Sequence, residues 1–242
     1  EMKKFLKKEI NPNDDIEFIN YIFDGGFPKA IEYETEEAKR QYVKSIIREI
    51  YDKDIKANKS IRDFALFEQI QQYIINNFGA TFSCKTLTEK INQSTGITHS
   101  LKTIYNYISI LESAKIISRC KRFDLKSKKS LSGEEKYYLS DLSFYFSTNT
   151  DKRINYGPVL GNILYNYLKA HDYDVSIGKI GKLKVDFILN KGRNEYSYVQ
   201  VAKTIDNGIY DANGIPVTEE REYRPLETIK DNYPKYVLTL DR

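Results

Sequence analysis

The spacing of apolar residues predicts that the chain begins with helices. Positions 14–22 form one short helical pattern, which the run Asp24-Gly25-Gly26 ends. Thr35 is typical of an N-cap for a longer helix, because its hydroxyl can accept a hydrogen bond from an N–H of the first turn. The apolar positions of this longer helix recur at helical spacing at Tyr42, Val43, Ile46, Ile47 and Ile50. Such a stripe needs a partner surface, and we assign residues 1–59 to a helical connector.

Residues 60–140 have the element order of a winged-helix domain. A helical pattern begins at Ile61, Ser83 is placed to cap the next helix, and a further helix is expected over 98–114. The inward positions of that last helix are predicted to be Leu101, Ile104, Ile108 and Leu111. Two strands, 116–123 and 135–139, then flank a loop at 124–133 that would be the wing.

The outer side of the 98–114 helix carries the kinds of side chain that read DNA in the major groove: His99, Lys102, Thr103 and Asn106. Between Lys115 and Lys136 there are 8 basic residues against 3 acidic ones. We therefore predict a DNA interface with phosphate contacts from Arg119, Lys121, Arg122, Lys126, Lys128 and Lys129. Winged helices also serve as packing modules, so a protein-interaction role stays open.

Residues 141–242 combine a helix that starts at Pro158 with several strand patterns. Strand alternation predicts Val185 and Phe187 on one face, with Asp186 and Lys184 on the other. Gln200 lies in the middle of the next strand. Antiparallel pairing of the two strands would bring Asp186 and Gln200 side by side, as a candidate site for a hard cation or a phosphate.

Several motifs, in order along nearly the whole chain, carry a family resemblance. They are YIFDGGFP at 21–28, KDI at 53–55, EKYYLSDL at 135–142, GPVLGN at 157–162, GKLKVDF at 181–187, YVQVA at 198–202 and KDNYPKYVLTLD at 230–241. Together they resemble the C-terminal region of a family of prokaryotic AAA+-type ATPases that ends in a restriction-endonuclease-like PD-(D/E)XK core. The resemblance implies an α+β fold, in which a helical and winged-helix part is followed by a small α/β restriction-endonuclease-like domain over 141–242.

The resemblance also implies a nuclease site, with departures. Asp186 and Gln200 match its metal-binding positions, and such nucleases gather carboxylates around Mg²⁺ and place a Lys beside the attacking water. Gly161 stands where the family has a helix Glu, and Ala202 stands in the Lys position. Asp186 would then be the remaining carboxylate metal ligand, with Lys184 as a migrated catalytic lysine. We expect an inactive nuclease core, with an active Mg²⁺-dependent DNA endonuclease as the alternative.

Composition and charge add further expectations. The chain has 242 residues, and 40% hydrophobic content is ample for buried cores. The net charge of +4 comes from positions 55–199, which carry 22 basic and 13 acidic residues. Cys84 and Cys120 have no His partner at ligand spacing, which favours reduced thiols. No apolar run is long enough to span a bilayer and no signal peptide opens the chain, so a cytoplasmic protein without a membrane partner is expected.

The sequence contains no GxxxxGK[ST] phosphate-binding loop, so this chain is not expected to hydrolyse ATP by itself. In the resembled family an ATPase module precedes this region, which implies that the chain is a C-terminal fragment and that ATP and Mg²⁺ bind to the missing upstream domain. The leading hypothesis is a DNA-binding and nuclease-like accessory region of an AAA+-type ATPase, with DNA and that upstream domain as partners. The third interpretation is a protein-interaction or oligomerisation module.

Overall fold

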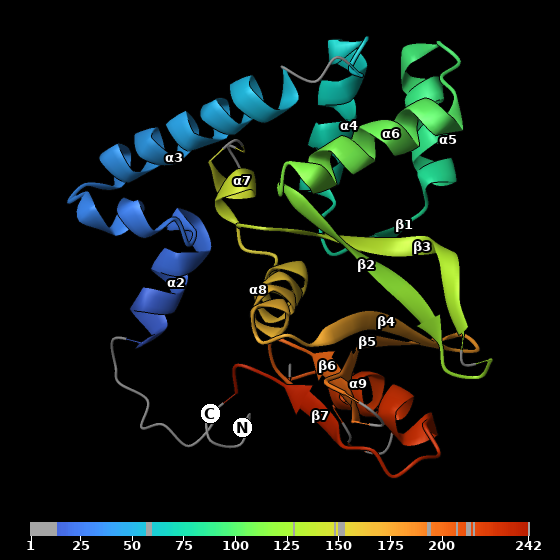
Figure 1. The fold of residues 1–242 in the computed structure, drawn as a ribbon. Helices are drawn as coiled ribbons and strands as arrows, with labels where there is room; N and C mark the ends of the chain where they lie inside the picture. The colour runs from blue at the N-terminus through green and yellow to red at the C-terminus, as the bar shows by residue number, and fades with distance from the viewer. Residues whose placement is uncertain are drawn as a thin grey trace.

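The computed structural model describes residues 14–56, 60–127, 129–147, 149, 153–192, 195–206, 208–211, 214 and 216–241 (Figure 1). Over these residues the fold is mixed α+β, with eight α-helices and one seven-stranded mixed sheet. The strand order is β1-β3-β2-β4-β5-β6-β7. The strands are β1 (Thr81–Phe82), β2 (Ile117–Asp124), β3 (Lys129–Leu139), β4 (Asp174–Ile180), β5 (Leu183–Asn190), β6 (Tyr196–Val201) and β7 (Lys235–Leu238).

The helices are α2 (Asp14–Asp24), α3 (Glu36–Ile50), α4 (Phe64–Asn76), α5 (Cys84–Thr95), α6 (Leu101–Ser113), α7 (Ser143–Phe146), α8 (Tyr156–Ala170) and α9 (Val217–Thr228). A 3₁₀ turn at Pro28–Glu32 and a π-helical turn at Tyr51–Ile55 flank α3. None of the helices in the described part of the chain is both long and apolar enough to span a bilayer.

Side-chain caps fix where these helices begin. Thr35 Oγ1 accepts a hydrogen bond from the N–H of Ala38 at 3.2 Å, and Ser83 Oγ accepts one from the N–H of Thr86 at 3.0 Å, so both predicted caps are confirmed. Helix α6 begins later than predicted because Ser100 caps it. This start leaves Leu101 in the first turn, where its side chain is 51% exposed, so the prediction that Leu101 faces inward is wrong.

The predicted wing loop at 124–133 is also wrong, because most of it is strand. Strand β3 begins at Lys129, opposite Asp124, and a turn is described at 125–127. The β2–β3 ladder contains an irregularity between Cys120 and Arg122, and on β3 Gly133 and Glu134 have φ of 81° and 54°.

A parallel pair between β2 and β4 joins the two halves of the sheet. It aligns Arg122 with Ile177, Phe123 with Gly178 and Asp124 with Lys179. Gly178 has no room for a side chain, because an added Cβ would lie 2.8 Å from Val185 Cβ. The hairpin from residues 60–140 is therefore hydrogen-bonded to the strands of residues 141–242 within one sheet, as Figure 1 shows.

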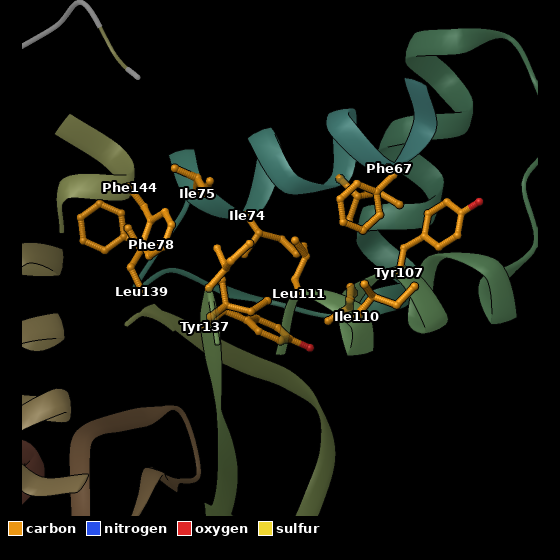
Figure 2. Packing of buried hydrophobic residues seen from close by; sticks show 14 of the residues in the cluster. Phe67, Ile74, Ile75, Phe78, Tyr107, Ile110, Leu111, Tyr137, Leu139 and Phe144 are labelled. Carbon is orange, nitrogen blue, oxygen red and sulfur yellow. The ribbon is translucent and has the colours of Figure 1, made fainter. Parts of the chain in front are cut away.

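Three apolar clusters lie on the faces of this sheet. The largest packs α4 and α6 against β3, where Phe67, Tyr107 and Tyr137 are buried together (Figure 2). A second cluster packs α8 against β5 and β6, and a third packs α9 against the opposite face of the same strands. The C-terminal strands are therefore covered by a helix on each side.

A buried asparagine fixes α8 to the end of β3. Asn162 is fully buried, its Oδ1 accepts the N–H of Leu139 at 2.7 Å, and its Nδ2 donates to the carbonyl of Leu139 at 2.9 Å. Asn166, one turn further along α8, donates to the same carbonyl at 2.9 Å from a more exposed position. The side chain at 162 thus satisfies backbone groups that water does not reach.

We predict that Asn162→Ala lowers the free energy of unfolding by about 1–3 kcal/mol, because the buried N–H of Leu139 loses its side-chain acceptor. Urea unfolding followed by circular dichroism measures the loss. Asn166→Ala is the matched control and should cost less than about 1 kcal/mol, since Asn162 still bonds Leu139. Equal losses in the two variants would contradict this account of α8.

Candidate functional site

Asp186 and Gln200 lie side by side, as the sequence predicted. The ladder between β5 and β6 ends at the pair Phe187 and Val199, and beyond it side chains replace backbone partners. The N–H of Asp186 donates to Gln200 Oε1 at 2.6 Å, and the N–H of Val201 donates to Asp186 Oδ2 at 3.2 Å. Each side chain therefore accepts a hydrogen bond from the backbone of the other strand. We call this arrangement the Asp186–Gln200 pair.

A β-bulge in β5 includes Asp186. Ser176 of β4 pairs with Ile188 and Gly178 pairs with Val185, so one residue of β4 opposes two residues of β5, Asp186 and Phe187. The bulge breaks strand alternation. Val185 packs in the cluster under α9 and Phe187 in the cluster under α8, so the prediction that they share a face is wrong.

Lys136 is the cation beside the Asp186–Gln200 pair. Its Nζ lies 3.1 Å from Asp186 Oδ1, and both side chains are largely covered. Because Oδ2 accepts the N–H of Val201, both carboxylate oxygens of Asp186 have partners within the protein. Sequence reasoning missed Lys136, because it lies 50 positions away on β3 and no local spacing connects it to Asp186.

Glu222 of α9 is a second carboxylate at the site, behind Gln200. Its Oε2 accepts a hydrogen bond from Gln200 Nε2 at 3.1 Å, and its Oε1 accepts one from Arg221 Nε at 2.8 Å. The family resemblance indicated Asp186 as the remaining carboxylate ligand and did not identify Glu222. Burial raises the pKa of Glu222, and the negative charge of Asp186 raises it further, although Arg221 opposes both effects. In the sequence Glu222 lies in a charged run, Glu219 to Glu222, whose pattern predicts a helix over the sheet but does not single out one carboxylate.

A cleft of about 390 Å³ opens next to Asp186 and Lys136. Its walls include Gly161 of α8 and the turn that follows α4. An added Cβ at Gly161 would meet Tyr138 Cε1 at 3.8 Å, which is an ordinary contact distance, so packing does not demand a glycine here. The position matched to a helix Glu in the resembled family therefore faces the cleft without a carboxylate.

Lys184, the lysine predicted for this site, and Lys203, which follows Ala202 in the sequence, do not line the cleft. Lys184 is exposed and pairs in register with Lys179 of β4. Lys203 is exposed with its Nζ 4.5 Å from the centre of the Tyr156 ring, while Ala202 between the site and Lys203 is buried. Lys136 of β3 is the lysine whose ammonium group contacts Asp186.

The donor set does not suit Mg²⁺. Magnesium needs several oxygen ligands with accessible lone pairs at short distance. Gln200 Oε1 accepts the N–H of Asp186, and both oxygens of Asp186 have partners. Within the described ranges no three His, Cys, Asp or Glu side chains gather into a metal-binding group. The residues at Asp186 fit a hydrogen-bonded structural pair better than a metal centre.

The predicted DNA-binding residues fall into two sets. On α6, Lys102 and Asn106 are exposed and Thr103 is half-buried, as is His99 just before the helix. In the β2–β3 hairpin, Lys121 and Lys126 are exposed. Lys128 lies outside the described residues, and for Lys129 the backbone alone is described.

The two arginines of the predicted DNA interface are held by other protein groups. Arg119 bonds Glu112 at 2.5 Å and Tyr105 Oη at 3.0 Å, and Arg122 pairs with Glu134. A guanidinium that already has carboxylate partners is less available to a phosphate than an exposed lysine.

The two cysteines are free thiols with raised pKa values. Burial raises the pKa of the Cys120 thiol to about 12, and partial burial raises the pKa of the Cys84 thiol.

Residues 15–152 match a family described as a domain of unknown function (DUF8612). The chain belongs to this family. The matched segment contains the helices α3 to α7 and the β2–β3 hairpin, whereas Asp186 and Gln200 lie beyond it.

The curated relatives are similar over most of the chain. An uncharacterized protein of Haemophilus influenzae is 27% identical over 215 residues, which is 89% of this chain and 50% of that protein. The uncharacterized protein MJ1544 of Methanocaldococcus jannaschii is 26% identical over 236 residues, or 93% of this chain and 50% of that protein. The chain thus spans about half the length of the curated relatives it matches. No solved structure matches it. These comparisons name no ATPase or nuclease, so that resemblance remains a hypothesis.

The raised pKa of Glu222 predicts a pH dependence. The folded protein binds this proton more tightly than the unfolded chain does, so the free energy of unfolding falls as pH rises from the ordinary carboxyl value of 4.5 through the raised pKa. Glu222→Gln has no carboxyl group at this position, so its stability does not fall with this ionisation. The free energy of unfolding of Glu222→Gln minus that of the wild type should therefore rise between pH 4.5 and the raised pKa of Glu222. Urea unfolding at a series of pH values measures it.

Glu220→Gln is the control for this experiment, because Glu220 is exposed and lies on the same helix. Its unfolding free energy should follow the wild type at every pH. A Glu222→Gln curve parallel to that of the wild type would show that burial of Glu222 does not affect its proton affinity.

Proposed function

We propose that this chain is a DNA-binding and nuclease-like accessory region of an AAA+-type ATPase, and that its nuclease core is inactive. The observation that carries the proposal is the two-sided character of α6. Its inner positions Ile104, Ile108 and Leu111 are fully buried, whereas Lys102 and Asn106 on the opposite side are exposed. A helix with this division can enter a major groove without disturbing its own core.

The arrangement of elements around α6 supports a winged-helix assignment. The chain order is α4, β1, α5, α6, β2 and β3, and the short strand β1 pairs with β3, whose other edge pairs with β2. Helix α6 follows α5 after a turn at Gly96. In this proposal α6 is the recognition helix, and the hairpin places Lys121 and Lys126 for phosphate contacts.

The nuclease-like part is proposed to be a scaffold. Hydrogen bonds within the Asp186–Gln200 pair and the ion pair with Lys136 use the oxygens that a metal would need. Gly161 and Ala202 leave the cleft without a helix carboxylate and without the lysine of the resembled motif. The restriction-endonuclease-like body would then position the DNA-binding part through the shared sheet.

Two observations support the proposal that an ATPase module belongs to the same protein: the motif resemblance, and the greater length of the matched relatives. The matched relatives contain about as many residues again outside the matched region, which is room for an ATPase module. In this proposal ATP and Mg²⁺ act in that other part of the protein, and the upstream domain is a partner of the helices α2 and α3.

One observation favours a protein-interaction module as the second candidate. Ile97, Leu101 and Tyr105 are 59%, 51% and 49% exposed around the start of α6, on the element proposed to read DNA. Large apolar side chains grouped on a surface are typical of protein interfaces. This candidate predicts discrete oligomers in light scattering and no affinity for duplex DNA.

We predict that the chain binds duplex DNA with an affinity that falls steeply as salt rises, because phosphate contacts release counterions. Lys102→Ala should reduce the slope of log affinity against log salt by about 1, the effect of losing one phosphate contact. Fluorescence anisotropy with a labelled duplex measures the slope.

Lys44→Ala is the matched control, since Lys44 is an exposed lysine on α3, away from the proposed interface. It should leave the slope unchanged. Absence of duplex binding at low salt, or binding that does not respond to salt, would exclude this function.

A further inference from the structure

Two hollows meet at the tip of the β2–β3 hairpin, away from the outer side of α6. One, of about 670 Å³, is lined by Phe123, Tyr196, Tyr198 and Tyr233 together with Lys126 and Lys230. The other, of about 610 Å³, shares Phe123 and Tyr196 and contains Lys115, Lys121 and Lys169. Figure 1 shows the hairpin tip beside the end of β4, where the N–H of Leu125 donates to the carbonyl of Lys179.

We infer that these two hollows form one groove that binds single-stranded nucleic acid, with a base among the aromatic rings and the backbone along the lysines. This groove goes beyond the duplex-binding function proposed for α6, and it shares with that interface the hairpin lysines Lys121 and Lys126. The chemistry is that of single-strand binding proteins, in which a basic track follows the phosphates and aromatic side chains stack on unpaired bases.

The aromatic rings are held in place but remain partly accessible. Tyr196 and Tyr233 are half-buried, and their ring centroids lie 5.4 Å apart at 61°. Tyr198 forms a buried part of the wall, and its hydroxyl donates to Asp231 Oδ2 at 2.6 Å. Asp231 Oδ1 accepts the N–H of Tyr233 at 3.2 Å, which fixes the backbone that carries this ring. A pocket prepared in this way loses little conformational entropy when a base enters.

The charge of the groove suits a polyanion. Lys115, Lys121, Lys126, Lys169 and Lys230 are all exposed along its two parts. Of the acidic residues in the walls, Glu112 is paired with Arg119, and Asp231 lies 4.0 Å from Lys235 Nζ. Asp174 is an exposed acid at the edge of the second part. Five lysines against these acids leave a net positive track.

The geometry favours a single strand over a duplex. The aromatic pocket lies in a concave region between the hairpin tip and the end of α9, so a base must leave its stack to reach Tyr233. Bases within a duplex stay stacked and paired, whereas those of a single strand can turn outward at little cost.

The absence of tryptophan from the sequence gives a direct test. Tyr233→Trp places a single tryptophan in the groove, and its fluorescence should be quenched saturably as an unlabelled oligothymidylate is added to the full chain. Tyr233→Ala should weaken oligothymidylate binding roughly five-fold to a hundred-fold, the range expected when one stacking ring is lost. Tyr210→Ala, at an exposed tyrosine outside the groove, should leave the affinity unchanged.

Charge and interface variants complete the test. The double variant Lys126→Ala and Lys230→Ala should reduce the salt slope of single-strand binding by about 1.4, because each phosphate contact contributes about 0.7 for a single strand. Lys102→Ala should leave single-strand affinity unchanged, because Lys102 does not line the groove. Absence of duplex binding by the wild-type chain would count against α6 and not against the groove. No quenching at low salt, or equal behaviour of Tyr233→Ala and Tyr210→Ala, would overturn the inference.

Discussion

The Asp186–Gln200 pair is the constraint on which the C-terminal half of this protein depends. The β5–β6 ladder ends at Phe187 and Val199, and beyond it Gln200 supplies an acceptor for the N–H of Asp186 from the neighbouring strand. Asp186 in turn accepts the N–H of Val201 and pairs with Lys136, while Gln200 reaches Glu222 on α9. Strands β3, β5 and β6 and helix α9 are thus tied together by polar groups that would otherwise be available for chemistry.

The shared sheet gives this constraint a wider effect. Because β2 pairs with β4, the hairpin that follows α6 and the strands that carry Asp186 belong to one hydrogen-bonded surface. Lys136 lies on the same hairpin, so the ion pair with Asp186 connects the proposed DNA-binding part to the C-terminal strands. Under the proposed function, the C-terminal strands would in this way support the DNA-binding helix without metal-binding chemistry of their own. The groove at Phe123 and Tyr196 lies along the same junction.

The sequence predicted those features that depend on local patterns. The caps at Thr35 and Ser83 and the adjacency of Asp186 and Gln200 follow from spacing over a few residues or from strand pairing through a short turn. Features that depend on long-range pairing were missed. Lys136 and Glu222 reach the site from other elements, and the bulge that separates Val185 from Phe187 arises from the register with β4, which no local pattern encodes.

A crystal of the protein soaked in Mn²⁺ tests the central claim most directly. Manganese accepts the same oxygen ligands as magnesium and is easily located by its scattering. The account predicts no ordered ion at the cleft and an unchanged ion pair between Lys136 Nζ and Asp186 Oδ1. An ordered manganese ion coordinated by Asp186 and Gln200, with Lys136 displaced, would contradict it.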